Sequence, residues 1–336
     1  MIKTGIIGLG KMGLSHASII NAHSDLDLIA VCDSSTLILE ALKKYGAYNA
    51  YTDYVKMISE NELEALFVAT PTKLHAAMVI YALEHNIHVF CEKPFSLTIE
   101  QGLKMTDLAT ERKLVNQVGY HNRFIGTFNF LRKVITSNAL GQIYHFVGEA
   151  YGPVVVKKKE VTWRSDSSEG GGCLFDYASH VINLIEFILG DIKDVSGVML
   201  KKVFSRGVED AVYAGLYLEN GLSGMLNVNW SDETYRKMST QLTVLGSEGK
   251  IITDAQEMKI FIKNENMELG LEKGWNMRYI TDLTDPVAFN LRGEEYSSQI
   301  DYFAKHIKAK DYNNVNSFAS ALNTDKVIEL IRIKAI

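Results

Sequence analysis

The chain has 336 residues, of which 47% are hydrophobic and 22% charged, and its formal net charge is −5. This length is sufficient for two domains with separate cores. The net negative charge excludes the broad basic field of nucleic-acid-binding proteins, and no apolar run approaches the roughly 20 residues of a membrane-spanning helix. We therefore expect neither a nucleic acid nor a membrane as a partner.

Cysteine and histidine spacing indicates neither a disulfide framework nor a metal site. The three cysteines, Cys32, Cys91 and Cys173, form no CxxC pair, and the nine histidines are scattered. Zinc-ligand spacings such as H-E-x-x-H are absent, and so is the Gly-x-Ser-x-Gly turn of a serine nucleophile. The first residues enter a strand directly, without the layout of a signal peptide. These features predict a cytoplasmic protein without a bound metal.

The first 33 residues carry the most informative motif. A short apolar run, Ile2–Ile7, leads directly into Gly8-Leu9-Gly10-Lys11-Met12-Gly13, and a helical stretch follows. A second apolar run, at residues 26–31, leads to Asp33, the twentieth residue after Gly13. A G-x-G-x-x-G turn in this setting is typical of a dinucleotide-binding site. The alternative is a glycine-rich turn in another kind of α/β protein.

Each residue of the motif has a mechanical role in such a site. Gly8 permits the tight turn, Gly10 lets the backbone approach a pyrophosphate, and Gly13 lets the helix pack close to the sheet. The helix that begins at Lys11 and Met12 presents free N–H groups to the phosphates. We assign all five residues to the cofactor site.

Asp33 also indicates which cofactor is preferred. Its carboxylate is placed to accept hydrogen bonds from both hydroxyls of the adenosine ribose, and it would repel a 2′-phosphate. The next residues, Ser34 and Ser35, supply no arginine to bind such a phosphate. We therefore expect NAD rather than NADP.

Strand-like and helix-like runs alternate along the first 120 residues. After the second strand they lie at residues 63–69, 74–85, 87–91, 98–111 and 114–119. This alternation predicts a doubly wound parallel sheet, a Rossmann domain of the α/β class. The carboxyl ends of its strands share one edge, where Gly8, Asp33, Thr70 and Lys93 fall and where open parallel sheets bind ligands.

The pattern changes after about residue 122, where helix and strand no longer alternate. Helices are predicted at residues 123–137, 175–189, 293–308 and 317–333, a strand at 143–151, and successive strands separated by turns over 195–262. This pattern is typical of a large, mainly antiparallel sheet with helices on one face. We expect a dinucleotide-binding domain at residues 1–122 and an α+β domain at 123–336.

Lys93 is the first candidate for catalysis. It follows an apolar strand and precedes Pro94, so it is expected at the sheet edge beside the nicotinamide. An ammonium group there would donate a hydrogen bond to a substrate hydroxyl and stabilise developing alkoxide charge. Partial desolvation would also allow Lys93 to transfer a proton. The alternative is a surface lysine paired with Glu92.

Asp176 and His180 are the second candidates, because they lie four residues apart on one face of a mostly apolar helix. Asn183 continues that face. A carboxylate that accepts from one imidazole nitrogen leaves the other nitrogen to take a proton, which is the arrangement of a general base. The glycine run at residues 170–172 suggests close approach of another group. The alternative is an Asp–His pair that only stabilises the helix.

A basic run, Lys157-Lys158-Lys159, interrupts the otherwise acidic chain. We interpret it as a solvated loop. The alternative is attraction for an anionic part of a substrate, such as a diphosphate.

Together these motifs resemble the glucose–fructose oxidoreductase / inositol dehydrogenase / MocA (Gfo/Idh/MocA) family of NAD(P)-dependent oxidoreductases. The resemblance runs over nearly the whole chain, and it is specific in the combination of its motifs. Besides the glycine turn, the markers are Ala69-Thr70-Pro71-Thr72 with His75, Glu92-Lys93-Pro94, Asn122-Arg123, and the glycine run that leads to Asp176 and His180.

The resemblance implies roles for particular residues. Lys93 would be the catalytic lysine, and Asp176 and His180 would act as orienting residue and base, with Lys93 or His180 as the primary base. The residues implied at the cofactor are Thr70, Pro71, His75, Glu92, Lys93, Asn122, Trp163 and Arg164. Those expected at the substrate are Lys93, Tyr151, Arg164, His180 and Asn183. The Lys93–Pro94 bond is expected to be cis, and homodimers or homotetramers are expected through the second domain.

One position departs from the family pattern. Many members carry an acidic residue three positions after the histidine, where this chain has Asn183. An amide can bind a sugar hydroxyl but cannot act as a carboxylate, which puts an inositol-type substrate in doubt. A loose likeness of residues 119–123 and 151–164 to members from polysaccharide and nucleotide-sugar pathways points to a sugar-like substrate.

The resulting hypothesis is an NAD-dependent dehydrogenase that oxidises a secondary hydroxyl of a sugar, inositol or nucleotide sugar. Two alternatives stay open. An NAD-using glycosidase of the same family would oxidise, eliminate and re-reduce its substrate without net redox change. An NAD-sensing regulator would lack the catalytic residues, whereas Lys93, Asp176 and His180 are present here.

Overall fold

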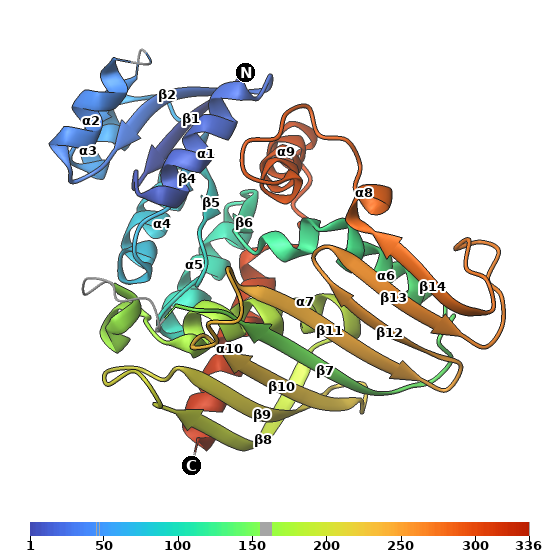
Figure 1. Ribbon diagram of the computed structural model, residues 1–336. Helices are drawn as coiled ribbons and strands as arrows, with labels where there is room; N and C mark the ends of the chain where they lie inside the picture. Colours follow the sequence, from blue (N-terminus) through green and yellow to red (C-terminus); the bar gives the residue numbers. More distant parts are fainter. Residues whose placement is uncertain (45, 47, 155–162, 336) are drawn as a thin grey trace. The chain divides into compact units, whose positions relative to one another are not determined.

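The computed structural model describes residues 1–44, 46, 48–154 and 163–335. The chain forms two compact units, Met1–His121 with Val287–Asp325, and Asn122–Pro286 with Lys326–Ile336 (Figure 1). The first break falls where the sequence pattern changes. However, residues 287–325 belong to the first unit, whereas the sequence placed all of 123–336 in a second domain. The basic run at residues 157–159 lies outside the described residues.

The first unit is built on a six-stranded parallel sheet with the order β3-β2-β1-β4-β5-β6. Strands β1 to β6 are Ile2–Ile7, Leu26–Cys32, Asn49–Tyr51, Ala65–Val68, His88–Cys91 and Asn116–Val118. The winding direction reverses between β1 and β4, which is the switch point where such sheets bind ligands. This order confirms the predicted doubly wound sheet.

Helices cover both faces of this sheet. They are α1 (Lys11–Ala22), α2 (Thr36–Lys43), α3 (Tyr54–Glu60), α4 (His75–Glu84), α5 (Ile99–Glu111), α9 (Glu294–Ala309) and the start of α10 (Phe318–Lys334). In β4, Leu66 and Val68 belong to one apolar cluster, while Ala65 and Phe67 belong to another. Burial on both faces explains why β4 is a continuous apolar run in the sequence.

The segment that returns to the first unit contributes to both clusters. Ile300 and Phe303 of α9 join the cluster of Phe67, and Phe318 and Leu322 of α10 join the cluster of Leu66. An amphipathic helix pattern predicts a buried face but does not say which sheet will receive it. That is why the sequence misassigned this segment.

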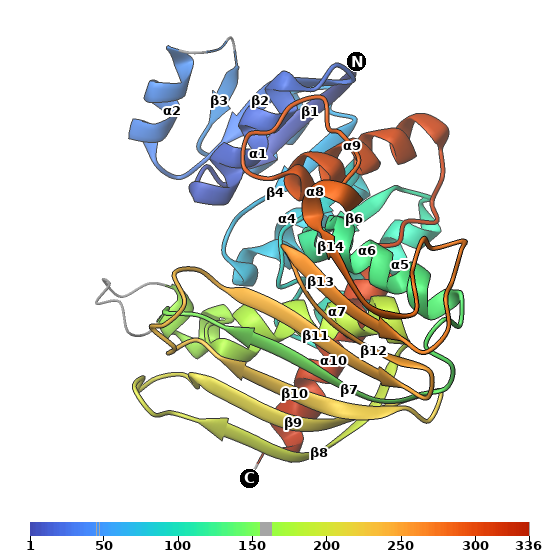
Figure 2. The same ribbon diagram turned by 45° about the vertical axis from the view of Figure 1, so that its right-hand side comes forward.

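The second unit contains an eight-stranded sheet with the order β14-β13-β12-β11-β7-β10-β9-β8 (Figure 2). Its strands β7 to β14 are Ile143–Tyr151, Ile192–Lys201, Ala211–Leu218, Ser223–Asn229, Ser239–Gly246, Gly249–Asp254, Glu257–Ile262 and Gly274–Tyr279. The β7–β10 pair is parallel and the other pairs are antiparallel. The predicted mainly antiparallel sheet is therefore confirmed.

Helices cover one face of this second sheet. They are α6 (Gly126–Thr136), α7 (Ser179–Leu189) and the end of α10, while the short α8 (Ile280–Leu283) follows β14. Burial alternates along β7, where Phe146, Gly148 and Ala150 are buried and the residues between them are half-buried. This alternation leaves the opposite face of the sheet open to solvent.

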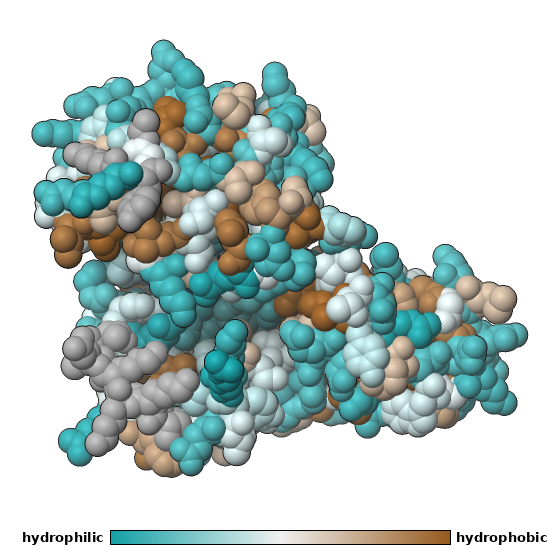
Figure 3. All heavy atoms as spheres, turned by 45° about the horizontal axis from the view of Figure 1, so that its top comes forward, coloured by the Kyte–Doolittle hydropathy of each residue, from teal (hydrophilic) through white to brown (hydrophobic). Residues whose placement is uncertain are grey.

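One helical stretch, residues 167–189, is long and apolar enough by composition to cross a membrane, although the sequence predicts no membrane-spanning run. Its most apolar window is 89% buried within the protein. Such burial is typical of a core helix and makes the stretch weak evidence for a membrane span. On the face drawn in Figure 3, hydrophilic side chains predominate and apolar ones gather in small patches.

Candidate active site

The glycine turn between β1 and α1 is shaped by close backbone packing. Gly8 has a φ of +88°, and a Cβ on it would lie 2.6 Å from the carbonyl oxygen of Ala69. A Cβ on Gly13 would lie 1.7 Å from the carbonyl oxygen of Gly8. No side chain fits at either position, so both glycines are required by the fold itself.

Gly10 differs, because a Cβ there would meet no atom within 4 Å. Gly10 is the N-cap of α1, whose first turn has neither a capping side chain nor an acidic residue. Lys11 is exposed and Met12 half-buried. The first N–H groups of α1 are thus available to an anion, and the space above Gly10 is a cradle that fits the phosphates of a dinucleotide.

Asp33 follows β2 at the same edge, and backbone groups hold its carboxylate. Oδ2 accepts from the N–H of Leu9 over 2.6 Å, and Oδ1 accepts from the N–H of Ser35 over 2.8 Å. An ionised carboxylate has about four acceptor positions. Two positions therefore remain for a pair of neighbouring hydroxyls, as the ribose of NAD presents.

The loop after β4 carries Thr70 and Pro71, which lie at the edge, half-buried and exposed respectively. His75 does not line this edge directly, because its ring has no exposed surface. Its Nε2 lies 2.9 Å from the carbonyl oxygen of Thr70, and its Nδ1 lies 3.4 Å from that of Phe95. Burial lowers the pKa of His75. A neutral ring has one N–H, so His75 donates to the Thr70 carbonyl, the nearer of the two, and its Nδ1 only lies near the loop that follows β5.

The loop after β5 carries Lys93, which is half-buried. The Lys93–Pro94 peptide bond is cis, as expected. Two residues later, Ser96 donates to Oδ2 of Asp325 from its N–H over 3.1 Å and from its hydroxyl over 2.7 Å. Asp325 is buried in α10, and burial raises its pKa to about 7. This carboxyl group fixes the far end of the lysine loop.

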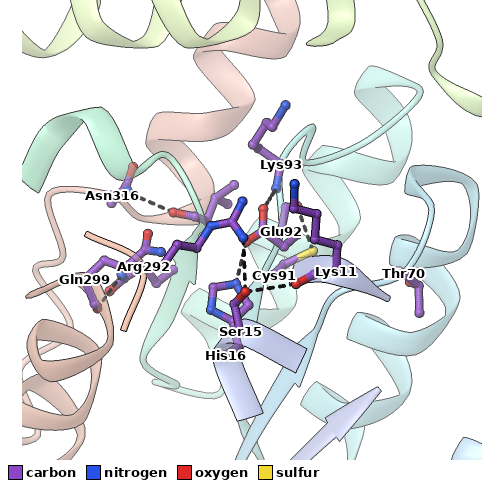
Figure 4. A network of polar contacts seen from close by, with 12 residues as sticks. Lys11, Ser15, His16, Thr70, Cys91, Glu92, Lys93, Arg292, Gln299 and Asn316 are labelled. Carbon is purple, nitrogen blue, oxygen red and sulfur yellow. Dashed lines mark hydrogen bonds and ion pairs between the residues drawn. The ribbon is translucent and has the colours of Figure 1, made fainter. Parts of the chain in front are cut away.

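His16 is a residue of this region that the sequence reasoning missed. It lies in α1 and is completely buried, and its Nε2 lies 2.6 Å from Oε1 of Glu92 (Figure 4). The only sequence signal was a histidine three residues after Gly13, at a position where an ordinary core helix would place an apolar residue.

Asp176 and His180 lie in the second unit, in one continuous helical stretch. Asp176 is 3% and His180 4% exposed. Nε of Arg164 donates to Oδ2 of Asp176 over 2.8 Å, and the Arg164 guanidinium stacks on the Trp163 ring at 4.7 Å. The structure therefore brings together Asp176, Arg164 and Trp163, which the sequence had assigned separately.

The helix around Asp176 is wider than predicted. Residues Leu174–Ala178 form a π-helical turn that leads into α7, instead of one regular helix over 175–189. The Ser179 hydroxyl donates to the carbonyl oxygen of Phe175 over 2.7 Å, which supports the widened turn. π-helical turns occur frequently at functional sites.

Two groups approach the glycine run: the carbonyl oxygens of Trp163 and Arg164 at Gly171, and the Glu209 carboxylate at Gly172. A Cβ on Gly172, whose φ is +111°, would lie 2.2 Å from Oε1 of Glu209. That oxygen accepts from the N–H of Leu174 over 2.9 Å, at the start of the π-helical turn. Burial raises the pKa of Glu209. The close approach at Gly172 is thus made by a side chain that holds the segment carrying Asp176.

The remaining expected substrate residues lie in different surroundings. Asn183 is 1% exposed, and its Oδ1 accepts from Nε of Arg123 over 2.7 Å. Tyr151 lies on the open face of the sheet, opposite α7, where its hydroxyl donates to Oε1 of Glu149 over 2.9 Å. The structure thus places Tyr151 on the face of the sheet opposite α7, the helix that carries His180.

Asn122 begins the second unit and is 4% exposed. Its buried Nδ2 has no hydrogen-bond partner among the described residues, which suits a group that binds a ligand. Over the same residues, no cluster of three or more histidine, cysteine or acidic side chains has the geometry of a metal site.

Comparison with known proteins agrees with this architecture. Residues 2–120 match the model of an oxidoreductase family with an NAD-binding Rossmann fold, and residues 128–252 match the GFO/IDH/MocA C-terminal domain. The chain belongs to the GFO/IDH/MocA family of NAD-binding oxidoreductases. It is an oxidoreductase family, and the relatives of this chain include sugar and inositol dehydrogenases.

Two curated relatives are similar to this chain over most of their length. D-glucoside 3-dehydrogenase of Escherichia coli is 29% identical over 238 residues, which are 66% of this chain and 68% of that protein. Myo-inositol 2-dehydrogenase of Thermotoga maritima is 24% identical over 278 residues, 80% of each chain. Two further sugar dehydrogenases align with this chain over 54% of their own length.

The fold also matches solved structures. A levoglucosan dehydrogenase in complex with NADH has a TM-score of 0.88 and 21% identity, and the match covers 99% of this chain and 96% of that chain. At this identity the likeness shows the fold, while the substrate has to be argued from the residues of this chain.

Proposed function

We propose that this GFO/IDH/MocA protein oxidises a secondary hydroxyl of a sugar-like substrate with NAD. The observation that carries the proposal is the buried Asp176–His180 segment, held by Arg164, in a chain whose other unit presents Lys93 at the edge of a dinucleotide-type sheet. A secondary alcohol gives up a proton from its oxygen and a hydride from its carbon on oxidation, and these residues account for the proton and for the charge on the oxygen.

His180 takes the hydroxyl proton as general base, and Asp176 fixes the imidazole in the required tautomer. Lys93 donates a hydrogen bond to the same oxygen and stabilises the negative charge that develops on it. Bound NAD supplies the two-electron oxidation of the carbinol carbon. The products are a ketone, NADH and a proton.

The residues proposed to hold the cofactor are Gly8, Gly10, Lys11, Met12, Gly13, Asp33, Thr70, Pro71, Glu92, Asn122, Trp163 and Arg164. The open space at Gly10 and the uncapped first turn of α1 support pyrophosphate binding. The acceptor positions left on Asp33 support a ribose without a 2′-phosphate. This arrangement favours NAD over NADP.

Arg164 and Asn183 are proposed on the substrate side, beside His180. Arg164 is half-exposed, since 41% of its side chain is accessible, so its guanidinium can contact a substrate while Nε holds Asp176. The Oδ1 of Asn183 accepts from Arg123, and the amide NH2 of the same side chain is the group that we propose to donate to a substrate oxygen. Donors in place of a carboxylate suit the oxygen-rich surface of a sugar or uronic acid.

The proposal is tested by incubating the purified protein with NAD and a panel of glucosides, inositols, uronic acids and UDP-sugars, and following NADH and the ketone product. The expected result is equal molar amounts of both from one substrate class. Cleavage of a glycoside without accumulation of NADH would instead identify the redox-neutral glycosidase. Binding of NADH without turnover of any substrate would favour a regulatory role.

We further propose that the open face of the eight-stranded sheet binds a second copy of this chain. Cross-strand pairing places Met277, Lys259, Ile252, Thr243, Val147 and Met225 in one row across this face. Met225 and Met277 are each 39% exposed and Tyr217, on the same face, is 48% exposed. A broad, flat face of this kind can pair with itself about a two-fold axis.

Light scattering of wild type and of Met225→Glu tests this assembly. A dimer or tetramer that Met225→Glu dissociates is expected, while Leu37→Glu, which changes an exposed residue of α2, leaves the assembly intact. A monomeric wild type, or an unchanged assembly in Met225→Glu, would contradict the proposal.

A reducing, cytoplasmic location is proposed from the cysteines. Cys32, Cys91 and Cys173 are all buried and unpaired, and burial raises the pKa of each thiol, that of Cys32 to about 12. Such thiols behave as small apolar side chains. Fractionation of the producing cell would test the location.

A further inference from the structure

His16 is a buried polar residue for which the glycine motif offers no role. It lies in α1 and is 0% exposed. Its ring packs against Phe90 at 5.3 Å, edge-on, and against Phe67 at 6.1 Å. A polar ring in an aromatic pocket is costly unless a strong hydrogen bond compensates for the lost hydration. The compensation comes from Glu92, whose Oε1 lies 2.6 Å from Nε2.

The surroundings of His16 fix the direction of this hydrogen bond. Nδ1 is buried and has no partner among the described residues, whereas Nε2 faces a carboxylate. A proton on Nδ1 would leave a buried donor unsatisfied, so the proton lies on Nε2 and the imidazole donates to Glu92. The carboxylate of Glu92 therefore accepts a charge-assisted hydrogen bond from Nε2 of His16.

Glu92 is held as an anion although it is buried. Burial by itself would raise its pKa, but the hydrogen bond from His16, the charge of Lys93 and the N–H of Lys93 lower the pKa below its ordinary value. The charge of this carboxylate also contributes to the pKa of four neighbouring groups, those of His75, Cys91, His121 and Tyr296.

The backbone around Glu92 leaves room for this anion. A Cβ on Gly119 would lie 2.9 Å from each carboxylate oxygen of Glu92, closer than real Cβ contacts come. Gly119 follows β6, the neighbour of β5 in the sheet. The glycine therefore creates the space that the carboxylate occupies.

The same carboxylate also reaches the lysine. Oε2 of Glu92 accepts from the backbone N–H of Lys93 over 3.2 Å. Figure 4 shows the two bonds on either side of the carboxylate, and the side chain of Lys93 extending away from it. Glu92 thus connects a rigid ring in α1 to the backbone from which the ammonium group projects.

We infer that His16 is a positioning residue for Lys93 and acts through Glu92. This inference rests on the proposed function, in which Lys93 is catalytic. Without His16, Oε1 of Glu92 loses its donor, the pKa of Glu92 rises, and the carboxyl group is free to rotate and to release the Lys93 backbone. The ammonium group then no longer projects toward the substrate oxygen in a fixed direction.

The test compares His16→Gln with His16→Asn. The longer Gln side chain can place an amide N–H near the position of Nε2, while Asn is too short to reach Glu92. We expect His16→Asn to lower kcat by about tenfold to a hundredfold, as small misplacements of catalytic groups do. We expect His16→Gln to recover most of that loss, and the dissociation constant of NADH to stay within about twofold of wild type in both.

Two further readouts separate positioning from general structural damage. The loss of kcat in His16→Asn should be almost absent when Glu92→Gln is already present, since the two act in series. The acid limb of the kcat profile should begin at higher pH in His16→Asn than in wild type, and this shift should vanish in the double variant. The inference would be overturned if the kcat losses of His16→Asn and Glu92→Gln multiplied in the double variant. It would also be overturned if His16→Asn were as active as wild type, or if His16→Gln were no more active than His16→Asn.

Lys93→Met serves as the reference for the proposed function. If Lys93→Met keeps full activity, Lys93 is not catalytic and the proposed function fails first. If Lys93→Met is inactive while both His16 variants are fully active, only the role of His16 is refuted.

Discussion

Nε of Arg164 donates to Oδ2 of Asp176 over 2.8 Å, from a side chain that is 41% exposed to a carboxylate that is 4% exposed. The carboxylate that we propose to orient His180 is therefore held by a residue outside its own helix. A charge-assisted bond of this kind is stronger than one between neutral groups, and it fixes one carboxylate oxygen in place.

Replacing Arg164 should therefore lower kcat more strongly than it lowers the stability of the fold. We expect Arg164→Met to lower kcat by about tenfold or more, because Asp176 loses the partner that orients it, and Asp176→Asn to lower kcat further, by about a hundredfold. Steady-state kinetics with the substrate found in the panel measures both. Arg206→Met, at an exposed position of the same unit, is the control and should match wild type. Unchanged kcat in Arg164→Met would refute the orienting role.

Gly13 and Gly10 of the glycine turn should respond in opposite ways to replacement by alanine. Gly13→Ala should destabilise the fold by about 3 kcal/mol or more, because its Cβ would lie 1.7 Å from the Gly8 carbonyl oxygen. Gly10→Ala should leave the melting temperature unchanged and weaken NADH binding by about tenfold, since its methyl group meets no protein atom and enters the proposed phosphate cradle. Thermal unfolding and NADH fluorescence titration measure the two effects. Intact NADH affinity in Gly10→Ala would show that the cofactor does not approach this turn.

Cofactor choice is expected to depend on the charge of Asp33. In Asp33→Asn the side-chain oxygen can still accept from Leu9 or Ser35, while the negative charge is gone. We expect NADH to bind about tenfold more weakly and NADPH to bind more tightly than in wild type, because the repulsion of a 2′-phosphate is removed. Competitive titrations with both nucleotides measure the ratio. A ratio that does not change would mean that Asp33 does not face the adenosine ribose.

Asp325 is expected to make stability depend on pH. Burial raises its folded pKa from 3.8 to about 7, so between these values the folded chain holds a proton that the unfolded chain releases. The contribution of Asp325 to the free energy of unfolding is therefore largest at low pH. It decreases as the pH rises toward 7, by at most about 1.4 kcal/mol per pH unit, and stays constant above pH 7.

Asp325→Asn removes this proton equilibrium and keeps an acceptor for Ser96. The difference in free energy of unfolding between wild type and Asp325→Asn should change by a few kcal/mol between pH 5 and 8, in favour of the variant at the higher pH. Urea unfolding at several pH values measures it, with the exposed Asp107→Asn as control. A difference that is constant with pH would contradict the assignment.

The parts of the fold that the sequence predicted are those with strong periodic signals. The glycine turn, Asp33 and the fully buried β4 could be located because turn chemistry and continuous apolar runs are local properties. Strand β3, of only three residues, and the short α3 were not predicted, since segments of that length carry no period. The π-helical turn at Leu174–Ala178 was also missed, because widening by one residue leaves the apolar spacing of a helix nearly unchanged.

The missed features of the candidate site depend on tertiary contacts. His16 and Glu92 are 76 residues apart in sequence, so no local pattern joins them. Alternation along β7 predicts two faces but not which one α7 will cover, so the sequence could not show that Tyr151 lies on the face opposite α7. The glycine run at 170–172 correctly indicated a close approach, but the approaching groups, Glu209 among them, could be identified only in three dimensions.

The most direct test of the proposed chemistry measures kcat for oxidation of the identified substrate in Lys93→Met, in His180→Gln and in the double variant, alongside NADH binding. We predict that each single variant loses about a hundredfold or more in kcat while NADH still binds, and that the double variant loses much less than the product of the two, because both groups act on one oxygen. Full activity in either single variant would contradict that prediction and remove the residue from the reaction.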